Sequence, residues 1–198
     1  MTILYTINNN LYVNLTNKCP CACTFCLRQE GEGVHGSESL WLEREPTLEE
    51  IKAEFDQHDL DSYDQIIFCG YGEPLERLDE VIEVCKYIRT KTDTHIRINT
   101  NGLADLIHKK QTAPLLAGLV DAVSISLNAP SAEEYIAIAR PSFGKASFAS
   151  LLGFAADCRK YIGDVTFTVV DMLSKEQLNA CKQLAEDMDI KFRVRVVI

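Results

Sequence analysis

Four cysteines stand within eight consecutive residues near the start of the chain. The spacing C-x3-C-x2-C marks Cys19, Cys23 and Cys26 as a ligand set, with Cys21 a bystander inside the loop. Three thiolates on so short a loop can hold three corners of a cubane iron–sulfur cluster. The fourth iron would then lack a protein ligand. An iron with open coordination positions can bind a small molecule and pass it an electron.

Two other kinds of site are compatible with the same loop. Cys23 and Cys26 form a C-x-x-C, which occurs in dithiol redox pairs and as one half of a zinc site. A structural zinc site normally needs a second pair of Cys or His ligands, and His35 is the nearby candidate. A redox pair leaves Cys19 unexplained. The loop by itself therefore leaves open a cluster, a zinc site, and redox or inert thiols.

Composition narrows the class of protein. The 198 residues, 46% hydrophobic and 25% charged, are typical of one globular domain with a substantial core. The net charge of −9 argues against a surface that holds nucleic-acid phosphates. We see no secretory signal and no apolar run long enough to span a membrane. Eight cysteines in such a chain indicate reduced thiols, so we expect a soluble, cytoplasmic protein.

Apolar runs and helix-start signals predict strands that alternate with helices. The expected strands are residues 11–16, 65–69, 95–99, 121–127, 165–170 and 192–198. The expected helices are residues 47–58, 77–90, 145–161 and 175–188, with a broken helical segment at 103–119 and a short helix after Ser131. Thr47 with Glu50, and Ser131 with Glu134, match the capping-box pattern. The alternation indicates parallel β-α-β units.

The number of expected strands sets the fold class. A closed eight-unit barrel needs about 250 residues, so this α/β chain favours an open or partial (βα)6 barrel of the TIM type, with a flat doubly wound sheet as the alternative. In both folds ligands bind beyond the C-terminal ends of the strands. The cysteine loop, the turns at 70–74, 99–102 and 126–128, and Asp171 all follow expected strands. We therefore expect these segments to meet at one edge of the sheet.

Several of these segments resemble one family. Phe25 precedes the last cysteine of the loop, Gly70-Tyr71-Gly72-Glu73-Pro74 stands in place of the usual GGEP, and Ser126-Leu127-Asn128 follows at the fourth strand. In this order the motifs resemble those of the radical S-adenosylmethionine (radical SAM) enzymes. Residues 40–46, 68–74, 98–102 and 124–130 resemble, more narrowly, the small radical SAM proteins named for their association with TatD-family nucleases. The resemblance covers the whole chain as a single radical SAM domain, residues 1–198.

The resemblance implies two cofactors. Cys19, Cys23 and Cys26 would hold a [4Fe–4S] cluster whose open iron takes the amino and carboxylate groups of S-adenosylmethionine. One electron would then cleave this cofactor to methionine and a 5′-deoxyadenosyl radical, which abstracts a hydrogen atom from the substrate. The protein's task would be to bind, orient and exclude water. The residues expected to contact S-adenosylmethionine are Phe25, Gly70, Tyr71, Gly72, Glu73, Asn101, Ser126, Asn128 and Val170.

Most of these contacts have a simpler structural alternative. The glycines before Glu73 would let the backbone approach the methionyl group, and Glu73 or the backbone beside it would accept from the ammonium, but the segment also suits a tight turn. Ser126 and Asn128 point to the same face of a strand, while Asn128 could also cap the next helix. Asn101 could serve its own turn, and Val170 could be a buried strand residue.

Three further features have no assigned role. The insertion at residues 27–45, which contains Trp41, could be a substrate lid or a packing anchor. Arg140 could meet an anionic substrate or form a surface salt bridge. Arg193 and Arg195 alternate on the last strand, and if their face looks into the barrel they need an anionic partner, such as a substrate carboxylate or phosphate.

The sequence supports two classes of function. The first is a radical SAM enzyme of oxidoreductase or lyase type, whose unknown substrate is a small molecule or a protein. A flavodoxin or ferredoxin would be its electron donor, and a TatD-family nuclease would be functionally linked to it. The second is a non-catalytic zinc or redox-thiol α/β module, which metal and sulfide analysis would reveal. We expect no membrane contact and no nucleic-acid substrate, and no residue is assigned to catalysis.

Overall fold

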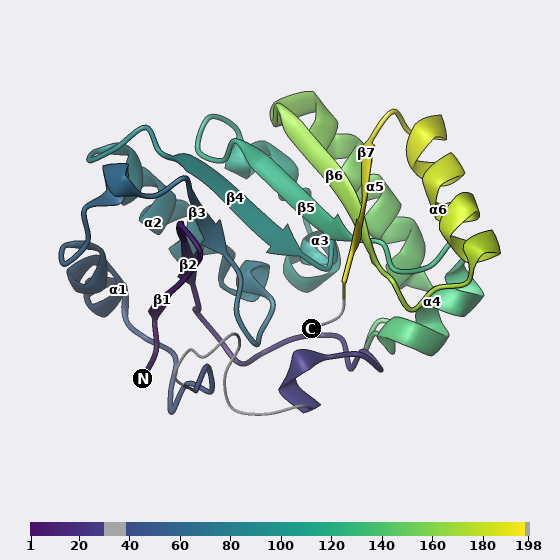
Figure 1. The fold of residues 1–198 in the computed structure, drawn as a ribbon, viewed down its shortest axis with the longest axis horizontal. Helices are drawn as coiled ribbons and strands as arrows, with labels where there is room; N and C mark the ends of the chain where they lie inside the picture. The colour runs from purple at the N-terminus through teal and green to yellow at the C-terminus, as the bar shows by residue number, and fades with distance from the viewer. Residues whose placement is uncertain (30–38, 197–198) are drawn as a thin grey trace.

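The strands form one open sheet. The computed structural model describes residues 1–29 and 39–196, and within them the spatial order of the strands follows the chain (Figure 1). The strands are β1 (Leu4–Ile7), β2 (Asn10–Val13), β3 (Gln65–Phe68), β4 (His95–Thr100), β5 (Ala122–Ser126), β6 (Asp164–Val170) and β7 (Lys191–Arg195). β1 pairs antiparallel with β2, and each later neighbour pair is parallel. Within the described residues β1 and β7 do not pair, so the sheet is an open, partial barrel.

The strand order decides between the two predicted folds. In a doubly wound sheet the order reverses at a switch point. Here each parallel strand is placed beside its predecessor, from β2 through β7. The crossovers therefore progress in one direction, as they do in a barrel. This confirms the predicted α/β fold with a partial barrel.

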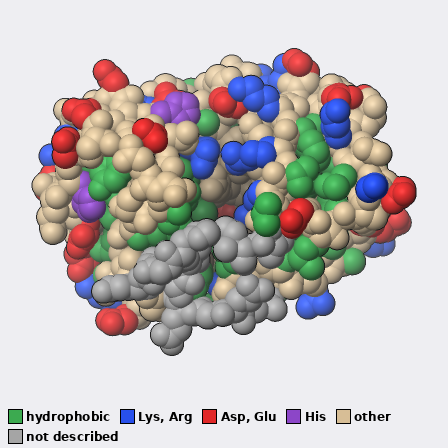
Figure 2. Space-filling model, in the orientation of Figure 1, with side chains coloured by type: hydrophobic (Ala, Val, Ile, Leu, Met, Phe, Trp, Pro, Cys, Tyr) green, Lys and Arg blue, Asp and Glu red, His purple; other side chains and the backbone are tan. Residues whose placement is uncertain are grey.

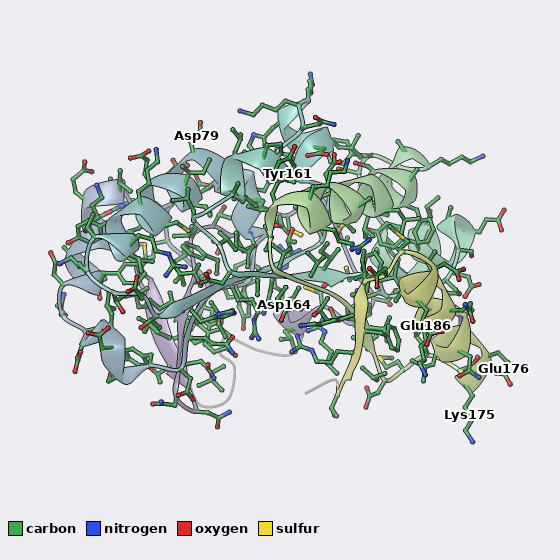
Figure 3. The ribbon with its side chains drawn as sticks, turned by 90° about the horizontal axis from the view of Figure 1, so that it is seen from above. Asp79, Tyr161, Asp164, Lys175, Glu176 and Glu186 are labelled. Carbon is green, nitrogen blue, oxygen red and sulfur yellow. The ribbon has the colours of Figure 1, made fainter. Side chains whose placement is uncertain are left out.

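Helices cover one face of the sheet and leave the other open. The helices are α1 (Leu48–Phe55), α2 (Leu78–Arg89), α3 (Ala104–His108), α4 (Ala132–Ala139), α5 (Ala146–Tyr161) and α6 (Lys175–Asp187). Short 3₁₀ segments span Leu27–Gln29, Leu60–Ser62, Pro74–Arg77 and Ala113–Leu116. Figure 3 shows Asp79 near the start of α2 and Tyr161 at the end of α5 on the same side of the sheet.

The two faces differ in chemistry because side chains alternate along each strand. The helix-covered face is apolar and buried in the main core: Phe68, Ile98, Val123 and Phe167. The open face is polar and lines hollows: Gln65, Arg97, Asn99, Ser124, Thr168 and Arg193. Parallel strands that are packed on both faces carry nearly continuous apolar runs. The open face therefore is not a second packing surface.

The structure adds one strand to the six that the sequence predicts. β1 pairs with β2 across a turn at Asn8 and Asn9, and Asn8 has a φ of 52°. Asn tolerates this left-handed conformation, and such a turn is a hairpin signal that the sequence prediction missed. β2 ends at Val13, earlier than the predicted range 11–16, because the following residues leave the ladder toward the cysteine loop.

Helix starts follow the predicted caps with one difference. Thr47 N donates to the Glu50 carboxylate at 2.8 Å and Glu50 N donates to Thr47 Oγ1 at 3.2 Å, which completes the capping box of α1. Ser131 caps α4 by accepting from Glu134 N at 3.3 Å. The Glu134 carboxylate, however, accepts from the side chain of Gln177 on α6. The other oxygen, Glu134 Oε1, accepts from the Ser131 hydroxyl at 3.2 Å, so neither oxygen accepts from the Ser131 backbone N–H and the second predicted capping box is incomplete.

The remaining predicted elements differ only at their ends. The predicted helix 47–58 ends at Phe55. The broken segment 103–119 consists of α3 and a 3₁₀ segment, and Lys109 in a left-handed conformation ends α3. β7 ends at Arg195, and residues 197–198 of its predicted range lie outside the described residues.

Candidate active site

The cysteine loop leaves β2 and is hydrogen-bonded to the segment that ends α4. Ala22 N donates to Ala139 O at 3.1 Å, and Ser142 N donates to Pro20 O at 2.8 Å. Cys21 also forms an isolated antiparallel bridge in this pairing. Backbone hydrogen bonds to a distant part of the chain therefore fix the loop over the open face.

The three predicted cluster ligands, Cys19, Cys23 and Cys26, are half-buried and form no disulfide. Cys21 is buried beside them, and its thiol hydrogen-bonds to the sulfur atoms of Cys19 and Cys23. These hydrogen bonds lower the pKa of Cys19 to about 6 and also lower the pKa of Cys23. The thiolate is the form that binds a metal. The hydrogen bonds from Cys21 therefore favour the thiolate form at both Cys19 and Cys23.

Arg28 reaches back to the loop and was missed by the sequence prediction. Its Nε donates to Cys26 Sγ at 3.4 Å, and its two terminal nitrogens donate to Asn17 O at 3.2 Å and Cys21 O at 3.3 Å. The guanidinium also lies 6.0 Å from the centroid of the Trp41 ring. A cation two residues after the last cysteine is the signal that could have identified it. Arg28 places a positive charge beside the thiols and braces the loop.

The carboxylate of Glu73 joins the ends of β3 and β4. Oε1 accepts from Thr100 Oγ1 at 2.7 Å and Leu75 N at 3.1 Å, and Oε2 accepts from Asn101 N at 2.7 Å. Glu73 is buried, and this burial raises the pKa of its carboxyl to about 8. Both oxygens are engaged inside the protein. The structure therefore favours the neighbouring backbone, rather than this carboxylate, as an acceptor for a ligand.

The glycines of the turn make room for the protein's own chain. A Cβ on Gly72 would lie 2.2 Å from Thr16 O and 2.6 Å from Lys18 O, and one on Gly70 would lie 2.1 Å from Asn14 Oδ1. Contacts under 3.0 Å with backbone cannot be relieved without moving the chain. The predicted reason for these glycines, a close approach to a ligand, is therefore replaced by close packing of the turn on the strand-to-cysteine connection.

Tyr71 packs against the described end of the insertion. Its ring meets that of Trp41 edge-on with the centroids 5.1 Å apart, and it shares a small buried cluster with Tyr5 and Leu40. This supports the packing-anchor interpretation for the part of the insertion around Trp41. Residues 30–38 lie outside the described residues, so the lid interpretation stays a prediction.

Asn101 after β4 and Asn128 after β5 differ in how the protein satisfies their side chains. Asn101 Oδ1 accepts from Leu103 N at 2.9 Å, as a turn residue does, while its Nδ2 donates to Cys19 Sγ at 3.8 Å. Asn128 has a φ of 54°, and its buried Oδ1 accepts no hydrogen bond from the described residues. The cap of α4 is Ser131 instead. A buried, unpaired amide oxygen costs free energy, so Asn128 offers an acceptor for a ligand.

All residues predicted for the site line one hollow of about 230 Å³, called here the outer hollow: Cys19, Cys23, Phe25, Cys26, Gly70, Tyr71, Gly72, Glu73, Asn101, Ser126, Asn128 and Val170. Asn99, in the predicted turn at 99–102, also lines it, and further lining residues that were not predicted for the site are Cys21, Arg28, Cys69, Ser124 and Thr168. Arg193 and Arg195 also border it, whereas Arg140 is the exposed residue that ends α4. Figure 2 shows basic side chains around a central depression of this face.

The donors of the loop suit a cluster. Among the described residues, no group of three or more Cys, His, Asp and Glu side chains is placed to hold one metal ion. A cubane cluster does not require such a group, because each of its thiolates binds a different iron. The lowered pKa values of Cys19 and Cys23 fit thiolate ligands. His35, the predicted partner for zinc, lies outside the described residues.

Comparison with protein families identifies the chain's relatives. The model of the radical SAM superfamily matches residues 13–188. The chain belongs to the radical SAM superfamily. This confirms the superfamily that the motifs predict, while the narrower TatD-associated group stays a prediction.

A curated relative shares sequence over part of this radical SAM chain. The GTP 3′,8-cyclase of Corynebacterium glutamicum (strain R) is 34% identical over 141 residues, which are 68% of this chain and 34% of the cyclase. The chain thus spans about a third of the length of the curated relatives it matches. The cyclase's activity is therefore not transferred to this protein.

Solved structures share the fold. A radical SAM methyltransferase from Sphaerobacter thermophilus has a TM-score of 0.68 at 17% identity, and the match covers 98% of this chain and 57% of the methyltransferase. SuiB of Streptococcus suis, bound to S-adenosylmethionine, has a TM-score of 0.67 at 17% identity, with 94% of this chain and 38% of SuiB covered. At such identities the likeness shows the partial barrel alone.

Membership of the superfamily supports the predicted radical SAM cofactors, whereas the oxidoreductase or lyase type of reaction stays a prediction. Radical SAM enzymes bind a [4Fe–4S] cluster and S-adenosylmethionine, and they need a substrate and a reductant. The alternative, a non-catalytic zinc or redox-thiol module, is therefore set aside. None of the helices in the described ranges has the length and apolar character needed to cross a membrane.

Proposed function

We propose that Cys19, Cys23 and Cys26 hold the [4Fe–4S] cluster and that S-adenosylmethionine binds in the outer hollow. The observation that carries this proposal is the convergence of the three thiols with every predicted cofactor residue in one hollow. When bound, the cluster supplies the electron that splits S-adenosylmethionine into methionine and a 5′-deoxyadenosyl radical, which takes a hydrogen atom from the substrate.

Groups around the thiols would adjust the reduction potential of the bound cluster. Arg28 donates to Cys26 Sγ, and Asn101 donates to Cys19 Sγ. Hydrogen bonds and positive charge at the sulfur atoms stabilise the more negative, reduced form and so raise the reduction potential. We assign to Arg28 and Asn101 this tuning of the electron transfer.

The strand ends would position S-adenosylmethionine. The backbone of Gly70–Glu73 would accept from the cofactor's ammonium, since the Glu73 carboxylate is engaged by the protein. Ser126 and the unpaired Oδ1 of Asn128 would bind its polar groups. Phe25 and Val170 line the same hollow and would cover the apolar parts of the nucleoside. Their contact would exclude water from the radical.

The same proposal includes the protein's subgroup within the superfamily, its cellular compartment, its electron donor and its substrate. The resemblance of residues 40–46, 68–74, 98–102 and 124–130 supports membership of the TatD-associated group and a functional link to a TatD-family nuclease. All eight cysteines are free, which is consistent with a reducing compartment, and we propose the cytoplasm. A flavodoxin or ferredoxin would supply the electron. The substrate is a small molecule or a protein, and the net charge of −9 speaks against nucleic acid.

The test is cofactor cleavage after anaerobic reconstitution and chemical reduction. We expect the wild type to contain iron and sulfide and to release 5′-deoxyadenosine from S-adenosylmethionine. Cys23→Ala should lose the cluster and this product, because two thiolates cannot replace three. Cys158→Ala, which removes a buried thiol on α5, is the matched control and should keep both. Zinc without sulfide in the wild type, or unchanged product from Cys23→Ala, would contradict the proposal.

A further inference from the structure

Two arginines on the open face border a second hollow of about 90 Å³, called here the inner hollow. Arg97 lies on β4 and Arg193 on β7. Ser124 and Arg193 line both hollows, and Arg193 Nη2 donates to Ser124 Oγ at 3.0 Å. The inner hollow is also lined by the first residues of β3, β4, β5 and β6. It therefore adjoins the outer hollow on the side toward the N-terminal ends of the strands.

Few groups of the protein compensate for the burial of the Arg97 charge. Its Nε is buried and donates to no described group. Burial lowers the pKa of Arg97, and repulsion from Arg193 acts in the same direction. A guanidinium nevertheless remains charged in proteins. A partly buried, incompletely paired cation costs free energy unless an anion accompanies it.

The nearby carboxylate is already paired. Asp164, which lines the inner hollow, accepts from Lys191 Nζ at 2.9 Å. Arg97 and Arg193 take part in none of the ion pairs formed between described residues. Figure 2 shows Lys and Arg side chains around the central depression of this face, although the chain carries a net charge of −9. The hollow is thus locally basic in an acidic protein.

We propose that Arg97 and Arg193 bind an anionic group of the substrate, a carboxylate or a phosphate, in the inner hollow. Planar guanidinium groups donate in pairs to the oxygens of either anion. Gln65, whose buried Oε1 has no described partner, adds an acceptor for a hydroxyl or amine beside the anion. An anion held there directs the rest of the substrate toward the outer hollow, so the inference rests on the proposed function.

The carboxylate of S-adenosylmethionine is a second anion that an arginine on this face can bind. Arg195 borders the outer hollow and does not border the inner one, in contrast to Arg193. Arg195 is therefore the arginine placed for the cofactor, and it separates the two anions in a test.

The experiment titrates sodium phosphate and, separately, sodium malonate into the reconstituted protein. S-adenosylmethionine is present, the cluster is oxidised, and sodium chloride holds the ionic strength constant. The shift of the thermal unfolding midpoint gives an apparent dissociation constant for each anion. Arg97→Gln and Arg193→Gln should each weaken it by roughly 10- to 100-fold, the effect of losing a charged hydrogen bond. Arg159→Gln, which removes an exposed cation paired with Asp189, should leave it unchanged.

Each outcome decides the matter. Selectivity for phosphate or for malonate indicates which anion the substrate carries. Equal binding by wild type, Arg97→Gln and Arg193→Gln, or no shift beyond that of chloride, overturns the proposal. Loss of binding in Arg195→Gln alone assigns the anion to the cofactor and also overturns it. If Arg97→Gln does not fold, Arg97→Lys keeps the charge without the fork and should still bind more weakly.

The anion titration and the cofactor-cleavage assay can fail independently of each other. Repeating it without S-adenosylmethionine probes the arginines alone. If no 5′-deoxyadenosine is formed but anion binding still depends on Arg97 and Arg193, the proposed function fails and the anion site remains. Cleavage without arginine-dependent anion binding removes the anion site and leaves the proposed function intact.

Discussion

On β6, Phe167 is fully buried among apolar side chains of the helix-covered face, whereas its neighbour Thr168 lines the outer hollow. β4 repeats the contrast with Ile98 in the core and Asn99 at the hollow. One strand therefore serves both faces, since its side chains alternate. The comparison teaches that the apolar face stabilises the fold by burial. The other face can therefore remain polar without loss of the fold.

The open face carries polar groups that the protein leaves unpaired. Four of the buried side-chain atoms without a described partner belong to residues that line the two hollows: Gln65 Oε1, Arg97 Nε, Asn99 Oδ1 and Asn128 Oδ1. The others, Asn14 Oδ1, Tyr135 Oη and Ser147 Oγ, belong to residues that line neither hollow. Buried polar groups in native proteins are normally hydrogen-bonded. Such groups gathered on one face indicate a surface arranged for ligands rather than for folding.

Substitution of neighbouring residues on β6 gives the largest expected contrast. Phe167→Ala should lower the free energy of unfolding by about 3–5 kcal/mol, through lost burial and the remaining cavity. Thr168→Val should lower it by about 1 kcal/mol or less, because it removes one long hydrogen bond, 3.3 Å, to Ile125 O. Urea unfolding followed by circular dichroism measures both. Similar losses for the two variants would mean that the faces do not divide the tasks as described.

Two glycines extend the contrast to the turns. Gly72→Ala should cost on the order of 3 kcal/mol and impair iron incorporation, because its Cβ would meet the carbonyl oxygens of Thr16 and Lys18. Gly153→Ala, at an exposed position of α5, places its Cβ where nothing lies within 4 Å and should stabilise the protein by about 0.5–1 kcal/mol. Unfolding curves together with iron analysis test the pair. A well-tolerated Gly72→Ala would show that the cysteine loop does not depend on this close packing.

The last comparison is the pH dependence of stability that Glu73 should cause. Its pKa in the folded protein, about 8, lies above the ordinary value of 4.5. Between these values the folded protein holds a proton that the unfolded chain has released, so this group's contribution to stability falls as pH rises from about 4.5 to about 8. Glu73→Gln should lack this slope in urea unfolding of the cluster-free, reduced protein. Parallel pH profiles for the two proteins would show that the Glu73 carboxylate is ionised throughout.

The sequence predicted which residues come together at the outer hollow because its signals are local. The cysteine spacing, the Gly70–Pro74 turn and the polar residue Asn128 can each be read within a few positions. One topological rule, that parallel strands present their C-terminal ends at the same edge, then brings these segments together. The outer hollow contains all of them. β1 was missed because a four-residue edge strand carries a weak apolar pattern.

Contacts between distant segments could not be predicted in this way. The sequence alone determined the cluster motif, the superfamily and the alternation of strands and helices, because these depend on residue type and short spacing. Only the tertiary structure decided that Gly72 makes room for Thr16 and Lys18, that Arg28 braces the cysteine loop, and that Arg97 and Arg193 share a hollow. Side chains from different strands become neighbours through the curvature and register of the sheet, which no local pattern specifies.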